Sequence, residues 1–290
     1  MSDARIKPSI RSALATVYAA MRAGYDPAVA PVDAAPDQGH DPHFLDEITP
    51  LLEFLYTKYF RVRMLGIENL PETGPGLVVA NHSGGVPYDG AMLIHGIHRE
   101  HPQHRRLRPL VANFAFRSPW MSQVVARIGG IRAAPSCARE LLAAGELVGV
   151  FPEGLRGVGK LFRERYRLER FGRGGFVRLA REAEVPIFPV AIVGAEEIHP
   201  VLAKMTRIAA PLGLPYIPIT PTFPLLGPLG LLPVPTKWTI QIGEPIVVPL
   251  HPATGGDLDA VVSETAERVR ARIDTLIADI LTHRHSIIFG

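Results

Sequence analysis

A histidine and an aspartate stand seven residues apart in the segment NHSGGVPYD (81–89). A histidine near the end of a buried strand can act as a general base at neutral pH. A carboxylate that binds its ring fixes the tautomer and stabilises the imidazolium. Two glycines and a proline lie between His82 and Asp89, and they favour a tight bend that returns Asp89 to the histidine. The alternative is structural: Asp89 as the N-cap of a helix, and His82 as a hydrogen-bonded turn residue.

Ser83 follows the histidine directly, which makes it a candidate nucleophile for a hydrolase. The chain contains no G-x-S-x-G sequence, the strand-to-helix turn on which α/β-hydrolases present such a serine. The sequence therefore favours His82 as a base over Ser83 as a nucleophile.

A second polar cluster, FPEGLR (151–156), follows another apolar run, and Lys160 comes shortly after it. Arginine near a strand end suits a phosphate group, because the guanidinium fork donates two charge-assisted hydrogen bonds to its oxygens. Nine arginines and lysines lie between residues 155 and 181. A solvated basic helix face is the alternative for the four arginines between 163 and 170.

Two sequence patterns that suggest a nucleotide site and a metal site are incomplete. The P-loop pattern runs from Gly154 to Lys160, but Leu161 replaces the serine or threonine that binds Mg²⁺, so a nucleotide kinase or NTPase is not favoured. Histidines recur at 95, 98, 101 and 104, but Pro102 interrupts the helix, nearby arginines oppose a cation, and surface histidines are expected instead. The single cysteine, Cys137, excludes a disulfide framework and a cysteine-rich zinc site, and we expect no metal.

The elements that position these clusters begin at residue 62, where short apolar runs alternate with helical stretches. Strands are predicted at 62–65, 76–80, 107–114, 146–151, 185–193 and 237–243. Helices are predicted at 44–60, 89–98, 119–128, 136–144, 174–183 and 257–283. This alternation predicts an α/β fold with a central, mostly parallel or mixed sheet covered by helices, preceded by an N-terminal helical segment. Both polar clusters fall at carboxyl ends of strands, where ligands of such sheets collect.

The composition is that of a folded chain: 290 residues, 47% hydrophobic and 20% charged, which excludes disorder over most of the length. The net charge of +3 is compatible with anionic lipid, coenzyme A or phosphate ligands. It is too small to indicate nucleic acid, which we do not expect as a partner.

The first 43 residues form a separate N-terminal region in this interpretation, and 44–290 form the main domain. Apolar residues from Ile10 to Met21 share one helix face with arginines near its ends, which is typical either of a helix on an anionic membrane or of one packed on the domain. Residues 27–42 contain four prolines and are predicted to be an irregular linker. No targeting signal was found, and a cytoplasmic location is expected.

Residues 208–235 contain no charged residue and eight prolines. The segment is long enough to cross a bilayer, but the prolines forbid a regular helix, and irregular backbone is not tolerated against lipid. We expect it to be either a buried extended part of the fold or an apolar surface that faces lipid or an acyl chain.

The NH…D motif, the FPEG-x-R motif and the later VPIFPVAIVG (185–194) together resemble the glycerolipid acyltransferase family, over about residues 44–250. Its best-known members are 1-acyl-glycerol-3-phosphate acyltransferases. The resemblance implies that His82 is the general base and Asp89 its partner. It implies that Glu153 and Gly154 line the acceptor site and that Arg156 contacts the acceptor phosphate.

The match has departures. The usual spacing places four residues between histidine and aspartate, and here there are six, as in a similar NHSG-x-x-P-x-D branch of bacterial lysophospholipid acyltransferase-like proteins. The family's basic block corresponds loosely to the sequence GGIR, which ends at Arg132. The lysine often found after FPEG corresponds to Lys160. The predicted substrate-binding residues are completed by Asn81, Ser83 and Gly84.

The implied reaction moves a fatty acyl group from acyl-CoA or acyl carrier protein to the hydroxyl of a lysophospholipid. It needs neither a metal nor another cofactor, since a thioester already carries a good leaving group. Backbone N–H groups at Gly84 and Gly85 are candidates to stabilise the oxyanion. The implied location is peripheral, on the inner face of the cytoplasmic membrane. Two rival functions stay open: a catalytically silent lipid-binding protein, and a thioester or ester hydrolase on the same scaffold.

Overall fold

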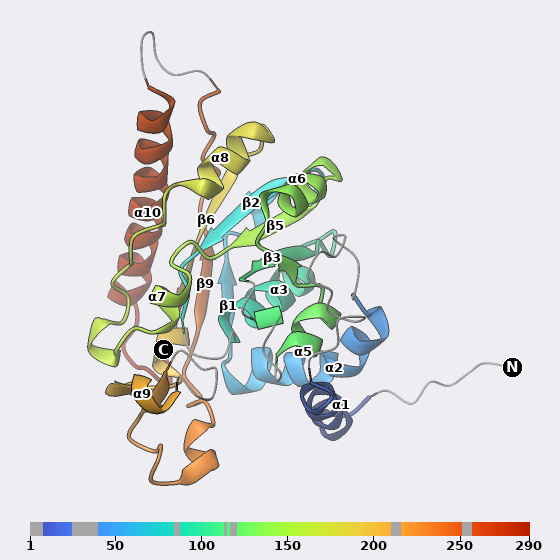
Figure 1. Ribbon diagram of the computed structural model, residues 1–290, viewed down its shortest axis with the longest axis vertical. Coiled ribbons are helices and arrows are strands. Elements are labelled where there is room, and N and C mark those ends of the chain that lie inside the picture. The colour runs from blue at the N-terminus through green and yellow to red at the C-terminus, as the bar shows by residue number, and fades with distance from the viewer. Residues whose placement is uncertain are drawn as a thin grey trace, which may run out of the picture.

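A seven-stranded sheet forms the centre of the computed structural model, which describes residues 8–24, 40–83, 88–112, 115–116, 121–209, 216–250 and 257–290 (Figure 1). The strand order is β1-β9-β6-β2-β5-β3-β4. Neighbouring strands are parallel except β6 and β9, so the mostly parallel, mixed sheet is confirmed. The strands are β1 (Arg63–Leu65), β2 (Gly76–Ala80), β3 (Leu107–Val111), β4 (Ile131–Arg132), β5 (Leu147–Val150), β6 (Ile187–Val193) and β9 (Thr239–Ile242).

Both faces of the sheet are covered, which explains the uninterrupted apolar runs in its central strands. Along β2, Leu77 and Val79 enter one core cluster, whereas Val78 and Ala80 enter the other. Every residue of β6 is buried. The two-residue side-chain period of a strand therefore divides the hydrophobic residues between two helical layers.

One layer holds α6 (Pro135–Ala143), α8 (Gly175–Glu182) and the long α10 (Leu258–Thr282), which runs beside β6 (Figure 1). The opposite layer holds α3 (Tyr88–Glu100) and the π-helical turn Leu55–Tyr59 that continues α2 (Pro42–Phe54). Its core includes Phe60 stacked on Trp238, with ring centroids 4.5 Å apart. These layers fix the strands whose ends carry the polar clusters.

The N-terminal helix α1 (Ile10–Arg22) packs against α2 and α5 (Ser122–Arg127). Ala20 lies in a small core with Phe44 and Ile48 of α2, while Leu14 and Tyr18 are exposed on another side of the helix. The predicted linker lies mostly outside the described residues. The boundary between residues 43 and 44 stays a prediction.

Several short elements were not predicted. They are the two-residue edge strand β4, the antiparallel hairpin of β7 (Ala203–Met205) and β8 (Ile217–Ile219), and the one-turn helices α7 (Leu155–Val158) and α9 (Thr206–Ala209). Elements this short carry no hydrophobic period, so propensity alone does not find them.

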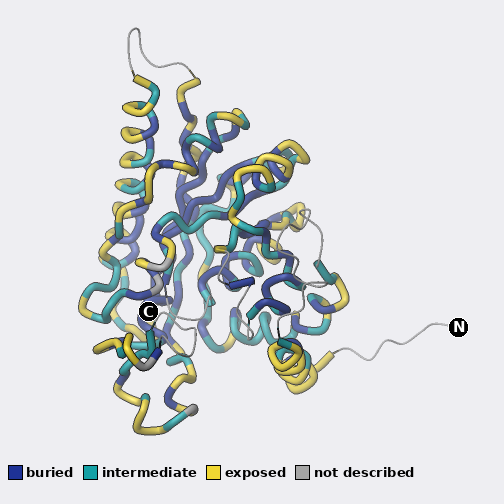
Figure 2. The backbone as a smooth tube through the Cα atoms, in the orientation of Figure 1, coloured by how far each residue is buried: buried dark blue, intermediate teal, exposed yellow. Residues whose placement is uncertain are grey.

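The described part of the segment 208–235 lies partly at the surface, although Ala209 and Thr220 within it are buried. It contains β8 and a 3₁₀ turn at Gly227–Leu231, and its described leucines, which lie between residues 225 and 232, are exposed (Figure 2). The buried alternative is therefore wrong for the five leucines between residues 225 and 232. Among the described residues, none of the helices has the length and apolarity that a membrane crossing requires.

Candidate active site

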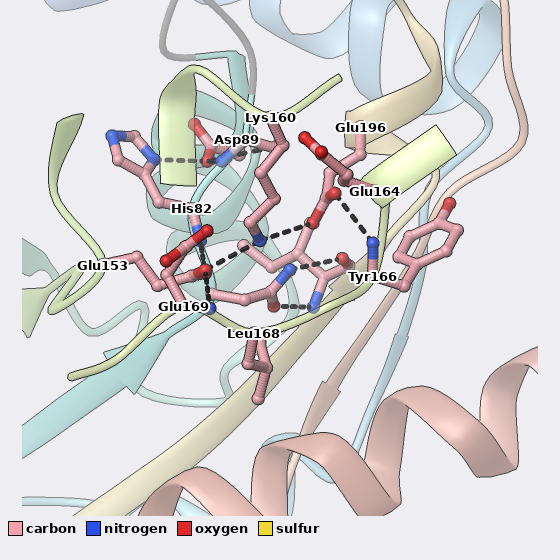
Figure 3. Close-up of polar contacts among 12 residues, drawn as sticks. His82, Asp89, Glu153, Lys160, Glu164, Tyr166, Leu168, Glu169 and Glu196 are labelled. Atoms are coloured by element: carbon pink, nitrogen blue, oxygen red, sulfur yellow. Dashed lines mark hydrogen bonds and ion pairs between the residues drawn. The ribbon is translucent and has the colours of Figure 1, made fainter. Parts of the chain in front are cut away.

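The two predicted clusters meet at one edge of the sheet, because β2 and β5 are parallel neighbours. Val79 is paired with Val150, so the residues after each strand emerge side by side. The backbone N–H of His82 donates to Glu153 Oε1 at 2.9 Å, which joins the clusters directly (Figure 3). Parallel pairing thus brings together residues that are 71 positions apart in the chain.

His82 and Asp89 form the contact that their spacing predicted. His82 Nδ1 lies 2.6 Å from Asp89 Oδ2, and the same carboxylate oxygen accepts the backbone N–H of Ser83 at 2.8 Å. The Asp89 side chain is fully buried, whereas 17% of the His82 side chain is exposed. The Nδ1–H therefore points inward to the carboxylate, and the Nε2 lone pair is left to accept a proton from a substrate.

The electrostatics of His82 follow from this pairing. Burial alone would lower the pKa of the imidazole, but the charge of Asp89 and its hydrogen bond outweigh burial. Glu153 adds to the effect, and the pKa of His82 lies above its usual value. The ring also packs on Phe151, with centroids 4.6 Å apart. The arrangement suits a general base, because Asp89 stabilises the imidazolium that forms when His82 accepts a proton.

Asn81 and Ser83, both predicted to bind substrate, are buried and bonded to protein groups. The amide of Asn81 bridges to β6, because its Nδ2 donates to the Ile192 carbonyl and its Oδ1 accepts the Ile192 N–H. Ser83 Oγ lies 3.3 Å from Asp89 Oδ2. Both side chains fix the turn that carries His82, and their contact with substrate stays a prediction. Gly84 and Gly85 lie outside the described residues.

Glu153 is a link between elements in this structure. Its Oε1 holds the main chain of His82, and its Oε2 accepts the Glu169 N–H at 2.8 Å and pairs with Lys160 Nζ at 2.7 Å. The carboxylate is fully buried and has three protein donors. A contact between Glu153 and an acceptor stays a prediction.

Lys160 faces inward between two carboxylates, with 5% of its side chain exposed. Its Nζ lies 2.7 Å from Glu153 and 3.3 Å from Glu196, a residue that the sequence analysis did not select (Figure 3). Burial raises the pKa of Glu196 to about 7, against the opposing effect of Lys160. Glu196 is the third residue after the carboxyl end of β6, the strand next to β2 in the sheet. The rule that selected the first two clusters would have found it there.

Arg156 is the exposed cation of the second motif, on α7. The next residue, Gly157, packs so closely on His82 that an added Cβ would lie 3.0 Å from the His82 carbonyl oxygen. The main chain that follows Arg156 therefore lies against His82, the candidate base. Gly154, whose φ of 54° glycine tolerates best, makes the turn into α7.

Arg132 stands apart from this cluster. It ends β4 at the edge of the sheet, three strands from β2, a separation of roughly 14 Å at the usual strand spacing. Among the described residues, no group of three or more histidine, cysteine, aspartate or glutamate side chains is arranged to hold a metal ion. Of the four regularly spaced histidines, His101 is buried, contrary to the expectation of a surface position.

Comparison with known proteins decides the family. Residues 61–193 match the Acyltransferase family model, a span that contains both motifs and β6. An uncharacterized protein of Mycobacterium leprae is 49% identical over 253 residues, which are 87% of this chain and 69% of that protein. This chain belongs to the acyltransferase family.

The acyltransferase resemblance seen in the sequence is thereby confirmed, and a solved structure supports the fold of this acyltransferase. The 1-acyl-sn-glycerophosphate (LPA) acyltransferase PlsC from Thermotoga maritima aligns with a TM-score of 0.54 at 21% identity, over 84% of this chain and 81% of that one. A bovine protein named a DGAT1/2-independent enzyme synthesizing storage lipids is 29% identical over 130 residues, 43% of this chain and 36% of its own.

Proposed function

We propose that this acyltransferase transfers a fatty acyl group from an acyl-CoA or acyl carrier protein thioester to the hydroxyl of a lysophospholipid such as 1-acyl-glycerol-3-phosphate. The observation that carries the proposal is the 2.6 Å contact between His82 Nδ1 and Asp89, which leaves Nε2 as the acceptor for a proton. No described residue hydrogen-bonds to that nitrogen in the structure.

In the proposed step, His82 Nε2 takes the proton of the acceptor hydroxyl as the oxygen attacks the thioester carbonyl. The carbon–oxygen bond forms, and the tetrahedral intermediate then expels the thiolate. The imidazolium returns its proton to the departing sulfur, so ester and free thiol are the products. General-base assistance of this kind contributes about 10²–10⁴-fold, and the alignment of the two substrates adds a proximity effect.

Arg156 is the proposed contact for the acceptor phosphate, since it is exposed and the next residue, Gly157, packs against His82. Lys160 supports the site from within, because its charge is already shared between Glu153 and Glu196. The exposed apolar face of α1, which includes Leu14, Tyr18 and Met21, supports a peripheral position on an anionic membrane, proposed here as the inner face of the cytoplasmic membrane.

The test is thiol release from palmitoyl-CoA, with and without lysophosphatidic acid, for the wild type, His82→Ala and the control His43→Ala, whose side chain is exposed. Acceptor-dependent release that only His82→Ala abolishes is expected. Release that needs no acceptor would replace the proposal with a hydrolase. No release, from protein that binds lipid, would replace it with a lipid-binding function.

The storage-lipid name of the bovine relative adds one acceptor to the assay. Monoacylglycerol carries the same hydroxyl group without a phosphate. If it is acylated as well as lysophosphatidic acid, and Arg156→Ala changes neither rate, the phosphate preference in the proposal is wrong.

A further inference from the structure

Five leucines stand exposed within eight residues of the segment after β8. They are exposed by between 44% and 85%, and we call them the leucine loop: Leu225, Leu226, Leu229, Leu231 and Leu232. Water is a poor solvent for such side chains, and a concentrated apolar patch on a folded protein marks a surface that binds something.

The loop is held in this shape by hydrogen bonds from two side chains to its backbone. Thr222 Oγ1 donates to the Gly230 carbonyl at 3.0 Å, and Tyr59 OH donates to the Pro233 carbonyl at 2.6 Å. The close approach of Gly230 to Thr222 leaves no room for a side chain at that position. The leucines are therefore presented outward by a defined turn.

The charges around the loop favour an anionic partner. From Ile198 to Thr236 the chain has no aspartate or glutamate, and its two cations are Lys204 and Arg207. Both are exposed, on β7 and α9, the short elements that precede the loop. A stretch of chain that carries exposed leucines and cations but no carboxylate complements the interface of an anionic bilayer.

The loop is also tied to the candidate site. The Leu231 carbonyl is bonded to His199 Nε2 at 2.8 Å, and the His199 ring lies 6.4 Å from the ring of Tyr88. Tyr88 begins α3 and is followed by Asp89, the partner of His82. In Figure 2 the exposed loop projects at the same end of the molecule as α1.

We infer that the leucine loop inserts into the interface of an anionic phospholipid bilayer, with Lys204 and Arg207 on the headgroups. The inference deepens the proposed function and rests on it for its purpose, because it names the surface that would bring the site to a lipid acceptor. Binding itself needs no turnover.

The experiment is co-sedimentation of the full chain with vesicles of equal phosphatidylglycerol and phosphatidylcholine, and with pure phosphatidylcholine. The test variant is Leu225→Ser with Leu229→Ser, two of the most exposed leucines. The matched control is Val247→Ser with Leu250→Ser, two exposed residues after β9. Burial of two leucines at the interface predicts at least a tenfold loss of binding for the test variant and no change for the control.

The contribution of the two cations is tested by Lys204→Ala and Arg207→Ala, each of which removes one positive charge. Each is expected to weaken binding to the anionic vesicles about fivefold, with no loss for Arg163→Ala, an exposed arginine of the basic stretch. If the variant with Leu225→Ser and Leu229→Ser binds the anionic vesicles as well as the wild type does, the inference is wrong, whether or not the oligomeric state of the variant changes.

Turnover separates this inference from the proposed function. With a short-chain lysophosphatidic acid below its micellar concentration, the leucine variant should release thiol at the wild-type rate. If no protein releases thiol but the leucine variant still loses vesicle binding, the proposed reaction fails and the docking surface stands.

Discussion

Glu153 Oε1 accepts the main-chain N–H of His82 at 2.9 Å, so the glutamate of the second motif holds the backbone of the base in the first. The same carboxylate receives Lys160 and the Glu169 N–H. One buried side chain thus ties β2, β5 and the chain after α7 together at the carboxyl edge of the sheet.

Glu153→Ala should therefore affect stability and turnover together. The change leaves the buried Lys160 with one carboxylate fewer and the His82 N–H without its acceptor, and breaking a buried pair costs about 3–5 kcal/mol. Thermal unfolding and thiol-release rates of this variant and of Glu140→Ala, an exposed control, measure the effect. Full turnover at wild-type stability would contradict the role given to Glu153.

The fold could be predicted because the central strands β2, β5 and β6 are apolar runs, and β2 and β6 are buried on both faces. The His82–Asp89 contact could be predicted because only six residues of turn-forming sequence separate the pair. The Glu153–Lys160–Glu196 cluster could not be predicted in this form. It depends on which strands are neighbours, and strand order is a tertiary property that periodicity does not encode.

Lys160 shows that a basic stretch of sequence does not predict whether a particular cation in it is exposed. Its place in a basic stretch suggested an open phosphate-binding cation, and the side chain instead lies buried between two carboxylates. The leucine loop shows the converse, since the exposure of its leucines follows from a turn held by Thr222 and Tyr59 rather than from composition.

Asp89→Asn should move the pH dependence of the reaction. In the wild type the pKa of His82 lies above its usual value of about 6.5, so kcat/KM should rise with a midpoint above that pH as the base deprotonates. Without the carboxylate, burial dominates and the pKa falls, so the midpoint should shift to lower pH. The plateau rate should drop by about 10²–10⁴-fold.

The measurement is kcat/KM for palmitoyl-CoA between pH 5 and 9, with Asp279→Asn as an exposed control. A fall in rate without any displacement of the midpoint would assign Asp89 to the structure of the turn rather than to the base.

Glu196→Gln should flatten the pH dependence of stability. The carboxyl holds a proton in the folded protein up to about pH 7 but releases it near pH 4.5 when unfolded, so the folded protein loses stability as pH rises through this window. At about 1.4 kcal/mol per pH unit, the loss is on the order of 3 kcal/mol. His82 acts in the same direction, because its raised pKa stabilises the fold at low pH and this contribution is lost as pH rises through that value.

Urea unfolding at pH 5, 6, 7 and 8 measures this dependence. The wild type should become less stable across the series, and Glu196→Gln should lose the part between pH 5 and 7 while it keeps the part due to His82. If the free energy of unfolding changes equally with pH in both proteins, Glu196 is not the group that titrates between pH 5 and 7.

Arg156→Ala should raise KM for lysophosphatidic acid and leave KM for monoacylglycerol unchanged. A charge-assisted hydrogen bond is worth about 1.5–3 kcal/mol, which predicts a rise of roughly tenfold to a hundredfold for the phosphorylated acceptor. Arg156→Lys should recover part of the loss, since it keeps the charge but not the two-pronged donor geometry. Arg163→Ala is the control, because that side chain lies in the same basic stretch and is 78% exposed. Equal effects of the two alanine variants on both acceptors would mean that the stretch acts through its overall charge, and that Arg156 is not the phosphate contact.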